Sequence, residues 1–377
     1  MSFPTAPMRS LLDAAHKAAL PEDEEEVWTL NLDQIESHSG KVLAKVMLNR
    51  SEAGPSTYVF NKGTVLYCKL RPYLNKVVVT EDDGVATTEL VPLRCDESKV
   101  LPHYLAHFLR SATFLAFATN VVAGAKMPRM VMSEFWSYPV PLPPLEEQRR
   151  IAAILDQAET LRTQRRTALA LLDSLTQSLF LDMFGDPATN PRKWPVKRLK
   201  DLGQVITGGT PPSSKEGMFD GPIPFITPGD LESEEPVRRS VTEAGAKEVN
   251  VVRAGATLVC CIGATIGKVG IAQKDSAFNQ QLNAVVWGNH ISDNYGYEVM
   301  RFFKPTIISW GASTTLPILK KSSFEQIEIP VPPVPLQELF TDRLKHISNL
   351  KGLHKSALLG FDNLFNALQS RAFAGEP

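Results

Sequence analysis

The chain has 377 residues, of which 43% are hydrophobic and 21% are charged, and its formal net charge at pH 7 is −1. This length predicts two to three domains with cores of their own, and the balanced charge excludes a global electrostatic attraction to nucleic acid. No apolar run reaches about 18 residues and no signal-peptide pattern opens the chain, so we expect a cytoplasmic protein with no membrane contact. Cys68, Cys95, Cys260 and Cys261 form no CxxC pair, which favours buried thiols in a reducing compartment.

Residues 1–143 are expected to form a first globular part. A helix is predicted at residues 8–20, and the acidic run at 22–26 is interpreted as a solvated loop. Residues 27–91 alternate apolar runs with turn signals and are predicted to be mainly β, and residues 102–117 have helical spacing.

Residues 144–184 are predicted to form one long helix. The segment has no Gly or Pro between Leu145 and Phe184, and at ~1.5 Å per residue it would extend about 60 Å. An alternating three-four apolar spacing, interrupted by Arg165, is typical of a coiled-coil seam. The seam positions are Ile151, Ile154, Ala158, Leu161, Ala168, Leu172, Leu175 and Leu179.

Residues 185–195 contain one Gly, three Pro, one Asp and one Asn without periodicity, and are predicted to be a linker. Residues 196–333 then form a second globular part, with apolar strand-like runs and a helical stretch near 297–303. Residues 334–374 form a second long helix, which Gly352 and Gly360 weaken by about 1 kcal/mol each relative to Ala.

The second half repeats the first. Shifting the sequence by 189 residues superimposes the two helices: Gln337 matches Gln148 and His354 matches Arg165. Farther upstream the shift becomes 192, where residues 63–68 match 255–260. The second apolar stripe consists of Phe340, Ile347, Leu350, Ala357, Phe361, Leu364 and Leu368.

No catalytic constellation is found. The spacing Gly263-x-x-x-Gly267-Lys268 is one residue short of a phosphate loop and lacks its Ser or Thr, so it is interpreted as a glycine turn carrying a cation. His103 and His107 have metalloprotease spacing without the required Glu, and a helix surface is the favoured interpretation. We expect no enzymatic activity, no cofactor and no metal ion.

Cations, amides and hydroxyls recur in the loops of both halves, where they could neutralise phosphates and read base edges. For any single residue a solvated surface loop is the simpler interpretation, and it is the recurrence in both copies that favours DNA binding. The candidates in the first half are Lys69, Arg71, Tyr73, Asn75, Lys76, Lys126 and Arg129. Those in the second half are Thr210, Thr227, Asp230, Thr265, Lys268, Asn279, Gln280, Lys320 and Lys321.

In the loops that carry these residues, and in the repeated long helices, the chain resembles the specificity (S) subunit of Type I restriction–modification systems. The resemblance covers nearly the whole chain. Its most specific parts are PLPPLEEQ at 141–148, IPFITPGD at 223–230, residues 263–268 followed by Asn279-Gln280, and residues 63–76. Leu336 departs from the pattern, because an acidic residue usually precedes the Gln at that position.

The resemblance implies an α+β fold, with two target-recognition domains in tandem and each followed by a long helix. The helices would run antiparallel as a coiled-coil spacer, relate the halves by a pseudo-two-fold axis, and dock two adenine-methyltransferase subunits. An endonuclease and translocase subunit could join that complex on double-stranded DNA with a bipartite target. The expected spacer and docking residues are Gln148, Ile151, Ile154, Leu161, Arg165, Leu172, Leu175, Gln337, Phe340, Ile347, Leu350, His354, Phe361 and Leu364.

Antiparallel helices would bring Arg165 close to His354, where a polar pair sets register at some cost in stability. A spacer of roughly 60 Å separates two half-sites by no more than about 18 base pairs at ~3.4 Å each. Two alternatives stay open from the sequence: a free-standing two-domain DNA-binding protein, and a scaffold that binds only proteins through its coiled coil.

Overall fold

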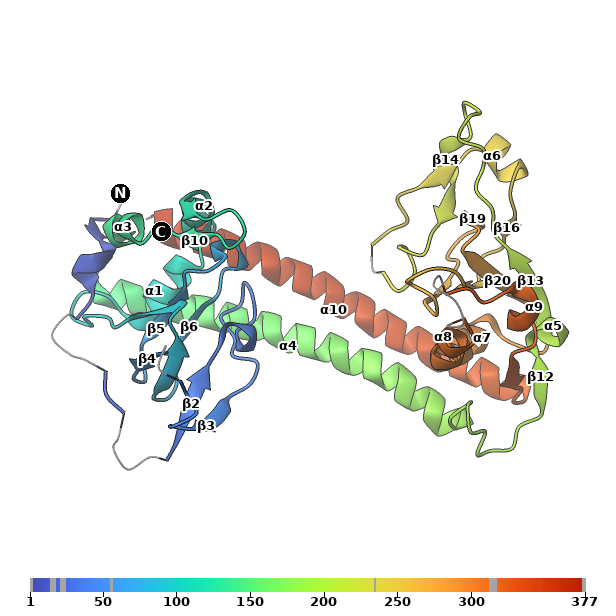
Figure 1. The fold of residues 1–377 in the computed structure, drawn as a ribbon, viewed down its shortest axis with the longest axis horizontal. Helices are drawn as coiled ribbons and strands as arrows, with labels where there is room; N and C mark the ends of the chain where they lie inside the picture. Colours follow the sequence, from blue (N-terminus) through green and yellow to red (C-terminus); the bar gives the residue numbers. More distant parts are fainter. Residues whose placement is uncertain are drawn as a thin grey trace. The chain divides into compact units, whose positions relative to one another are not determined.

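The computed structural model of the chain describes residues 3–13, 18–20, 25–54, 57–233, 235–311 and 317–374. The chain divides into two compact units. Unit 1 comprises Met1–Ala168 and His354–Pro377, and unit 2 comprises Leu169–Leu353. Both divisions fall inside the long helices α4 (Leu145–Phe184) and α10 (Val334–Ala374), so each unit combines one globular part with a segment of both helices (Figure 1).

Unit 1 contains two small sheets, one with the strand order β3-β2-β7-β4 and one with the order β6-β5-β8. The central pair β2–β7 is parallel and the other pairs are antiparallel. The strands are β2 (Glu26–Leu30), β3 (Val46–Asn49), β4 (Thr57–Phe60), β5 (Val65–Cys68), β6 (Val77–Val79), β7 (Gly84–Thr87) and β8 (Leu90–Leu93).

Shorter elements complete unit 1. Two-stranded pairs form between β1 (Thr5–Pro7) and β11 (Pro139–Pro141), and between β9 (Val122–Ala123) and β10 (Arg129–Met130). The helices are α1 (Pro102–Leu109), α2 (Ala112–Asn120) and α3 (Met132–Ser137), with 3-10 turns η1 (Met8–Leu11), η2 (Leu32–Gln34) and η3 (Pro72–Leu74).

Two predicted helices are corrected in this unit. The single helix expected at residues 102–117 is two helices, because Ser111 caps α2 by accepting a hydrogen bond from the Phe114 amide, and a new helix begins there. The helix expected at 8–20 is reduced to the turn η1, while residues 18–20 have no regular structure and residues 14–17 lie outside the described part.

The core of unit 1 includes its helix segments. Tyr67 of β5 packs ring against ring with Phe114 and Phe135, which also contact each other. From the long helices, Ile151 and Leu155 of α4 and Phe365 of α10 are buried in the same cluster. The start of α4 and the end of α10 therefore fold as part of this globular unit.

Unit 2 repeats the arrangement, with sheets ordered β13-β20-β17-β18 and β15-β14-β19-β16 and one parallel pair, β14–β19. A two-stranded pair β12–β21 corresponds to β1–β11. The strands are β12 (Val196–Arg198), β13 (Gly203–Thr207), β14 (Phe219–Ile226), β15 (Ser240–Val241), β16 (Val251–Val252), β17 (Thr257–Cys260), β18 (Val269–Ile271), β19 (Ser276–Phe278), β20 (Leu282–Trp287) and β21 (Glu328–Pro330).

The helices of unit 2 are α5 (Leu199–Leu202), α6 (Glu243–Lys247), α7 (Asp293–Phe302), α8 (Lys304–Gly311) and α9 (Lys321–Phe324). Phe180 and Phe184 at the end of α4 contact Phe340 at the start of α10, and both also contact Tyr295 of α7. The four cysteines of the chain are free and buried, as the sequence predicts.

The two long helices run antiparallel within each unit. In unit 1, Arg162 of α4 lies over the Phe365 ring of α10, and Arg165 lies over the Phe361 ring. In unit 2, Asp173 of α4 pairs with Lys351 of α10 at 2.6 Å, and Phe180 of α4 contacts Phe340 of α10. Within each unit, residue numbers rise along α4 while those of the partners fall along α10, and the α+β fold with paired antiparallel helices is confirmed.

The exposure of individual helix residues corrects the predicted seam. Ile151, Phe340 and Ile347 are buried, and Leu161, Leu172 and Phe361 are half-buried. Four predicted seam residues are exposed instead: Ile154 (36%), Leu175 (47%), Leu350 (46%) and Leu364 (50%). Because a straight helix drifts by ~20° per heptad from a repeat of 3.5, the neighbouring residues Leu155, Thr176 and Phe365 occupy the buried positions.

Candidate nucleic-acid interface

In unit 1, two loops are joined by backbone hydrogen bonds at the end of β5. Residues 69–76 form a tight turn closed by the Cys68 amide donating to the Lys76 carbonyl at 3.0 Å. The hairpin loop 124–128 between β9 and β10 lies beside it, because the Arg71 amide donates to the Pro128 carbonyl at 2.7 Å. The turn and the hairpin loop thus form one surface.

The predicted residues of these loops divide into two groups. Arg71, Tyr73 and Lys126 are exposed, and Lys69 is half-buried. The remaining three are held by internal contacts. The Asn75 amide nitrogen donates to the Arg110 carbonyl at 3.1 Å, the Lys76 ammonium donates to the Leu32 carbonyl at 2.6 Å, and Arg129 forms a forked pair with Glu89. The first group is available for a ligand, and the second fixes the loops.

The same turn recurs in unit 2 between β17 and β18. The Cys260 amide donates to the Lys268 carbonyl at 2.8 Å, and the Gly263 amide donates to the Pro317 carbonyl at 2.9 Å. Because a strand and not a helix follows this turn, the glycine-turn interpretation is correct and a phosphate loop is excluded. Thr265 is exposed at the position of Tyr73, and Lys268 is half-buried.

Backbone conformation distinguishes the two turns. Gly263 and Gly267 have φ angles of 95° and 89°, and their counterparts Arg71 and Asn75 both have a φ of 49°. A side chain in this left-handed region costs about 1–2 kcal/mol, except that Asn tolerates it better. Arg71 therefore adopts a strained backbone conformation that glycine would adopt without strain. Backbone strain of this kind is associated with functional sites.

Two further loops of unit 2 meet near Asn279. Its amide N–H donates to the Ile226 carbonyl at 3.0 Å, and its side chain donates to Gln281 at 3.1 Å. The Thr210 hydroxyl donates to the Gln280 side-chain oxygen at 2.6 Å, which joins a second loop. These contacts bring predicted residues of two loops together and orient amide and hydroxyl groups of the kind that read base edges.

The other charged residues predicted for unit 2 are Asp230, Lys320 and Lys321. Asp230 accepts hydrogen bonds from the Thr227 amide and hydroxyl at 2.7 and 2.6 Å, so this carboxylate stabilises its own turn. Lys320 and Lys321 are exposed at the start of α9, where Lys321 approaches Glu325 at 3.6 Å.

Gln148 and Gln337, predicted to contact a partner, are turned into the protein instead. They are 1% and 0% exposed. Gln148 accepts from the Leu101 amide at 2.9 Å and donates to the Lys99 and Pro143 carbonyls at 2.9 and 3.0 Å. Gln337 makes the same three kinds of bond, to the Ser292 amide and to the His290 and Pro332 carbonyls. Each glutamine attaches a long helix to its own globular part, so a docking role is wrong for both.

Arg165 and His354 are neighbours in unit 1, as predicted. The Arg165 guanidinium lies 3.3 Å from His354 Nδ1 and also lies 6.0 Å from the ring of Phe361. Arginine has no acceptor, so this contact requires Nδ1 to be unprotonated. The pair places polar groups on the contacting faces of two helices, where such groups favour one register over others.

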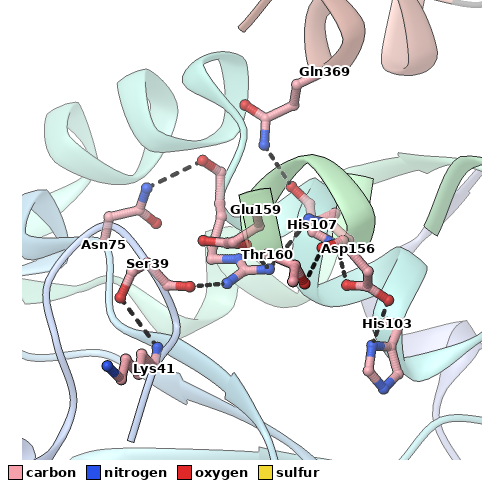
Figure 2. A network of polar contacts seen from close by, with 10 residues as sticks. Ser39, Lys41, Asn75, His103, His107, Asp156, Glu159, Thr160 and Gln369 are labelled. Atoms are coloured by element: carbon pink, nitrogen blue, oxygen red, sulfur yellow. Dashed lines mark hydrogen bonds and ion pairs between the residues drawn. The ribbon is translucent and has the colours of Figure 1, made fainter. Parts of the chain in front are cut away.

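A polar network that the sequence did not reveal attaches α1 to α4 (Figure 2). His107 is fully buried, so the interpretation as a helix surface is wrong for it. Asp156 of α4 lies 2.7 Å from His107 Nε2 and 3.1 Å from His103 Nδ1. The i, i+4 spacing of the histidines puts both on the α1 face that meets Asp156, and this spacing was the available signal.

The network fixes the protonation of His107. Arg110 can only donate, and it lies 3.1 Å from His107 Nδ1, so the proton of the neutral ring is on Nε2 and is donated to Asp156. Burial lowers the pKa of His107, whereas the hydrogen bond to Asp156 raises the pKa of the more exposed His103. Burial alone would raise the pKa of Asp156, but hydrogen bonds from both histidines lower it below its usual range. Arg110 also pairs with Glu159 at 3.2 Å.

Among the described residues, no group of three or more His, Cys, Asp and Glu side chains could hold a metal ion. In the same residues no helix combines the length and the apolar character that crossing a membrane requires.

Comparison with known proteins identifies the family. The model described as the Type I restriction modification DNA specificity domain matches residues 52–170 and 191–359. The specificity subunit of the Type I restriction enzyme EcoDI from Escherichia coli is 31% identical over 176 residues, which are 46% of this chain and 39% of that protein. The specificity subunit of the MjaIX enzyme from Methanocaldococcus jannaschii is 30% identical over 194 residues, which are 46% of this chain and 44% of that protein. The chain thus spans less than half the length of these relatives.

Solved structures share the fold. The crystal structure of a Type I restriction–modification system S subunit from M. genitalium has a TM-score of 0.65 at 13% identity, over 99% of this chain and 96% of that chain. A chain solved in work on complex assembly and conformational transition of the type I R-M system has a TM-score of 0.62 at 19% identity, over 100% and 98%. The family match covers more than half of the chain, and the chain belongs to the Type I restriction modification DNA specificity domain family.

Proposed function

We propose that this chain is the DNA sequence-specificity subunit of a Type I restriction–modification complex. The observation that carries the proposal is a repeated scaffold with unlike exposed side chains. Both units hold a tight turn against a second loop by equivalent backbone hydrogen bonds. Unit 1 exposes Arg71 and Tyr73 on this scaffold, and unit 2 exposes Thr265. Two related surfaces with different chemistry suit two unlike half-sites of a bipartite, asymmetric DNA target.

The chain would supply recognition, and its partners would supply catalysis. Exposed cations such as Arg71 and Lys126 suit phosphates, and the amides around Asn279 suit base edges. We infer that methyl transfer to adenine belongs to separate methyltransferase subunits, and that cleavage, where it occurs, belongs to an endonuclease and translocase subunit. The chain would then act in the cytoplasm, together with the DNA.

Apolar side chains on the outer faces of the long helices support docking of the methyltransferase subunits. In unit 2, Leu171, Leu350 and Leu353 are 64%, 46% and 68% exposed. In unit 1, Leu359 and Leu364 are 63% and 50% exposed. Large apolar side chains that stay exposed along two paired helices are available for contact with a partner. The proposed docking faces therefore include four residues that were predicted for the coiled-coil seam, namely Ile154, Leu175, Leu350 and Leu364.

We retain the domain boundaries as part of the proposal. Residues 1–143 and 196–333 would be target-recognition domains, residues 185–195 a linker, and residues 144–184 and 334–374 the spacer helices. The repeated sequence supports a pseudo-two-fold relation between the two halves.

One experiment separates this function from a free-standing DNA-binding protein and from a protein scaffold. The tagged full chain, co-expressed with its methyltransferase genes, is purified and tested on a random duplex library. The specificity subunit co-purifies with methyltransferase and enriches one split motif. A free-standing regulator enriches a motif without that partner, and a scaffold binds the partner without enriching DNA. Leu353→Glu should abolish co-purification while the control Ser348→Glu, at another exposed position of α10, retains it.

A further inference from the structure

Two large apolar side chains are exposed at the paired loops of unit 1. Tyr73 is 44% exposed at the apex of the turn, and Met127 is 46% exposed in the adjacent hairpin loop. Across the part of the chain that the structure describes, the Tyr73 ring and hydroxyl have no ring contact, ion pair or hydrogen bond. A single exposed aromatic side chain is ordinary, so the backbone that presents Tyr73 matters more than its exposure.

The backbone under Tyr73 is fixed from both sides. Pro72, which precedes it, is buried, and the Leu74 amide donates to the Arg71 carbonyl at 2.9 Å. Asn75 donates its backbone amide to the Pro72 carbonyl at 2.9 Å and its side chain to the Arg110 carbonyl at 3.1 Å. Such a turn presents an aromatic ring with little conformational entropy left to lose on binding.

Met127 is held in the same way. The pairing of Ala123 with Arg129 closes its hairpin loop, and Gly124 adopts a φ of 93° that a larger residue would adopt only with strain. The Arg71 amide bond to Pro128 connects this loop to the turn. Arg71 and Lys126 lie in these same two segments, and among the described residues their exposed side chains form no hydrogen bond or ion pair.

The corresponding turn of unit 2 shows that folding does not require the aromatic ring. It has equivalent backbone hydrogen bonds, glycines at both left-handed positions, and Thr265 at its apex. Tyr73 is therefore an addition to a scaffold that forms without it. An exposed aromatic ring beside cations suits stacking on a nucleic-acid base.

We propose that Tyr73, with Met127 in the adjoining loop, is an apolar wedge that stacks against a base of the first half-site and disturbs its base step. Arg71 and Lys126 would hold the flanking phosphates. The inference rests on the proposed DNA-recognition function and adds that the two half-sites are read differently: unit 1 by intercalation or stacking, and unit 2 by polar contacts. Partial unstacking by Met and aromatic side chains is a known way of reading DNA.

The test uses the complex that the full chain forms and a duplex of the motif that it enriches, with 2-aminopurine at each adenine in turn. Tyr73→Ala should weaken binding to the motif roughly 10- to 100-fold and remove the fluorescence change at one half-site. Tyr73→Phe should retain both within about twofold, because the stacking ring is kept. Tyr58→Ala, which removes a ring of similar exposure (42%) from β4, should leave affinity and fluorescence unchanged.

Other outcomes overturn the wedge and are separable from failure of the proposed function. A wild-type complex that does not distinguish the motif from a scrambled duplex refutes DNA recognition itself. A specific wild-type complex whose Tyr73→Ala variant keeps full affinity and fluorescence refutes the wedge alone. Full retention by Tyr73→Leu refutes stacking, because an aliphatic side chain would then be sufficient. Unchanged thermal unfolding of each variant excludes a folding defect.

Discussion

Replacing Gln148 by leucine tests how the first long helix is attached to its globular part. The side chain is 1% exposed and makes three hydrogen bonds, at 2.9, 2.9 and 3.0 Å. The substitution leaves one amide and two carbonyls without their partners. A buried polar group left unpaired costs about 1–3 kcal/mol, and the Leu101 and Lys99 groups can recover part of that from water. We expect a net loss of about 2–4 kcal/mol in the free energy of unfolding.

Urea unfolding followed by tryptophan fluorescence measures the loss, with Trp28 and Trp136 reporting on unit 1. The control is Gln157→Leu, which makes the same chemical change at an exposed position of α4 and should alter stability by less than about 0.5 kcal/mol. Gln337→Leu should reproduce the loss in unit 2, since its three bonds are equivalent. Equal effects of Gln148→Leu and Gln157→Leu would refute the reasoning.

Three further predictions concern charged and polar residues. The double variant Arg71→Gln, Lys126→Gln should weaken DNA binding on all sequences alike. It should also reduce the slope of log affinity against log salt concentration by about 1–2, in binding titrations between roughly 50 and 200 mM salt. An unchanged slope contradicts phosphate contacts. Burial lowers the pKa of His107 from its ordinary 6.5, so stability should fall as pH drops below that value, because the unfolded chain then binds a proton that the folded chain excludes. His107→Gln should be less stable than wild type at pH 8 and should lose that part of the acid dependence in unfolding titrations; an unaltered pH profile contradicts it. Replacing Arg165 and His354 together by leucine should raise the free energy of unfolding by about 1 kcal/mol, and replacing one alone should lower it; thermal unfolding of the three variants decides.

Much of the architecture could be predicted because it depends on local sequence patterns. The absence of Gly and Pro between Leu145 and Phe184 leaves a helix with nothing to interrupt it, and α4 has these bounds. The 189-residue shift that matched Arg165 with His354 also predicted their contact, because antiparallel helices of similar length meet at their midpoints. The glycine turn at Gly263 followed from spacing alone.

The predictions that failed depended on tertiary contacts. The burial of Leu155 in place of Ile154 results from a helical drift that no single residue signals. Gln148 was expected at the spacer and docking surface from the family resemblance alone, and two of its three partners, Leu101 and Lys99, lie far from it in the sequence. His107 is buried because both long helices pack against it, α4 through Asp156 and α10 through Phe365. The boundary between units 1 and 2 lies inside the long helices for the same reason, because each globular part packs on both helices.

Modified-base sequencing of genomic DNA from the source strain, with and without this gene, tests the central claim most directly. We expect one split, asymmetric motif that is methylated at adenine when the gene is present and unmethylated when it is absent. Methylation that is unchanged by deletion of the gene, while the methyltransferase genes are expressed, would contradict the assignment as a specificity subunit.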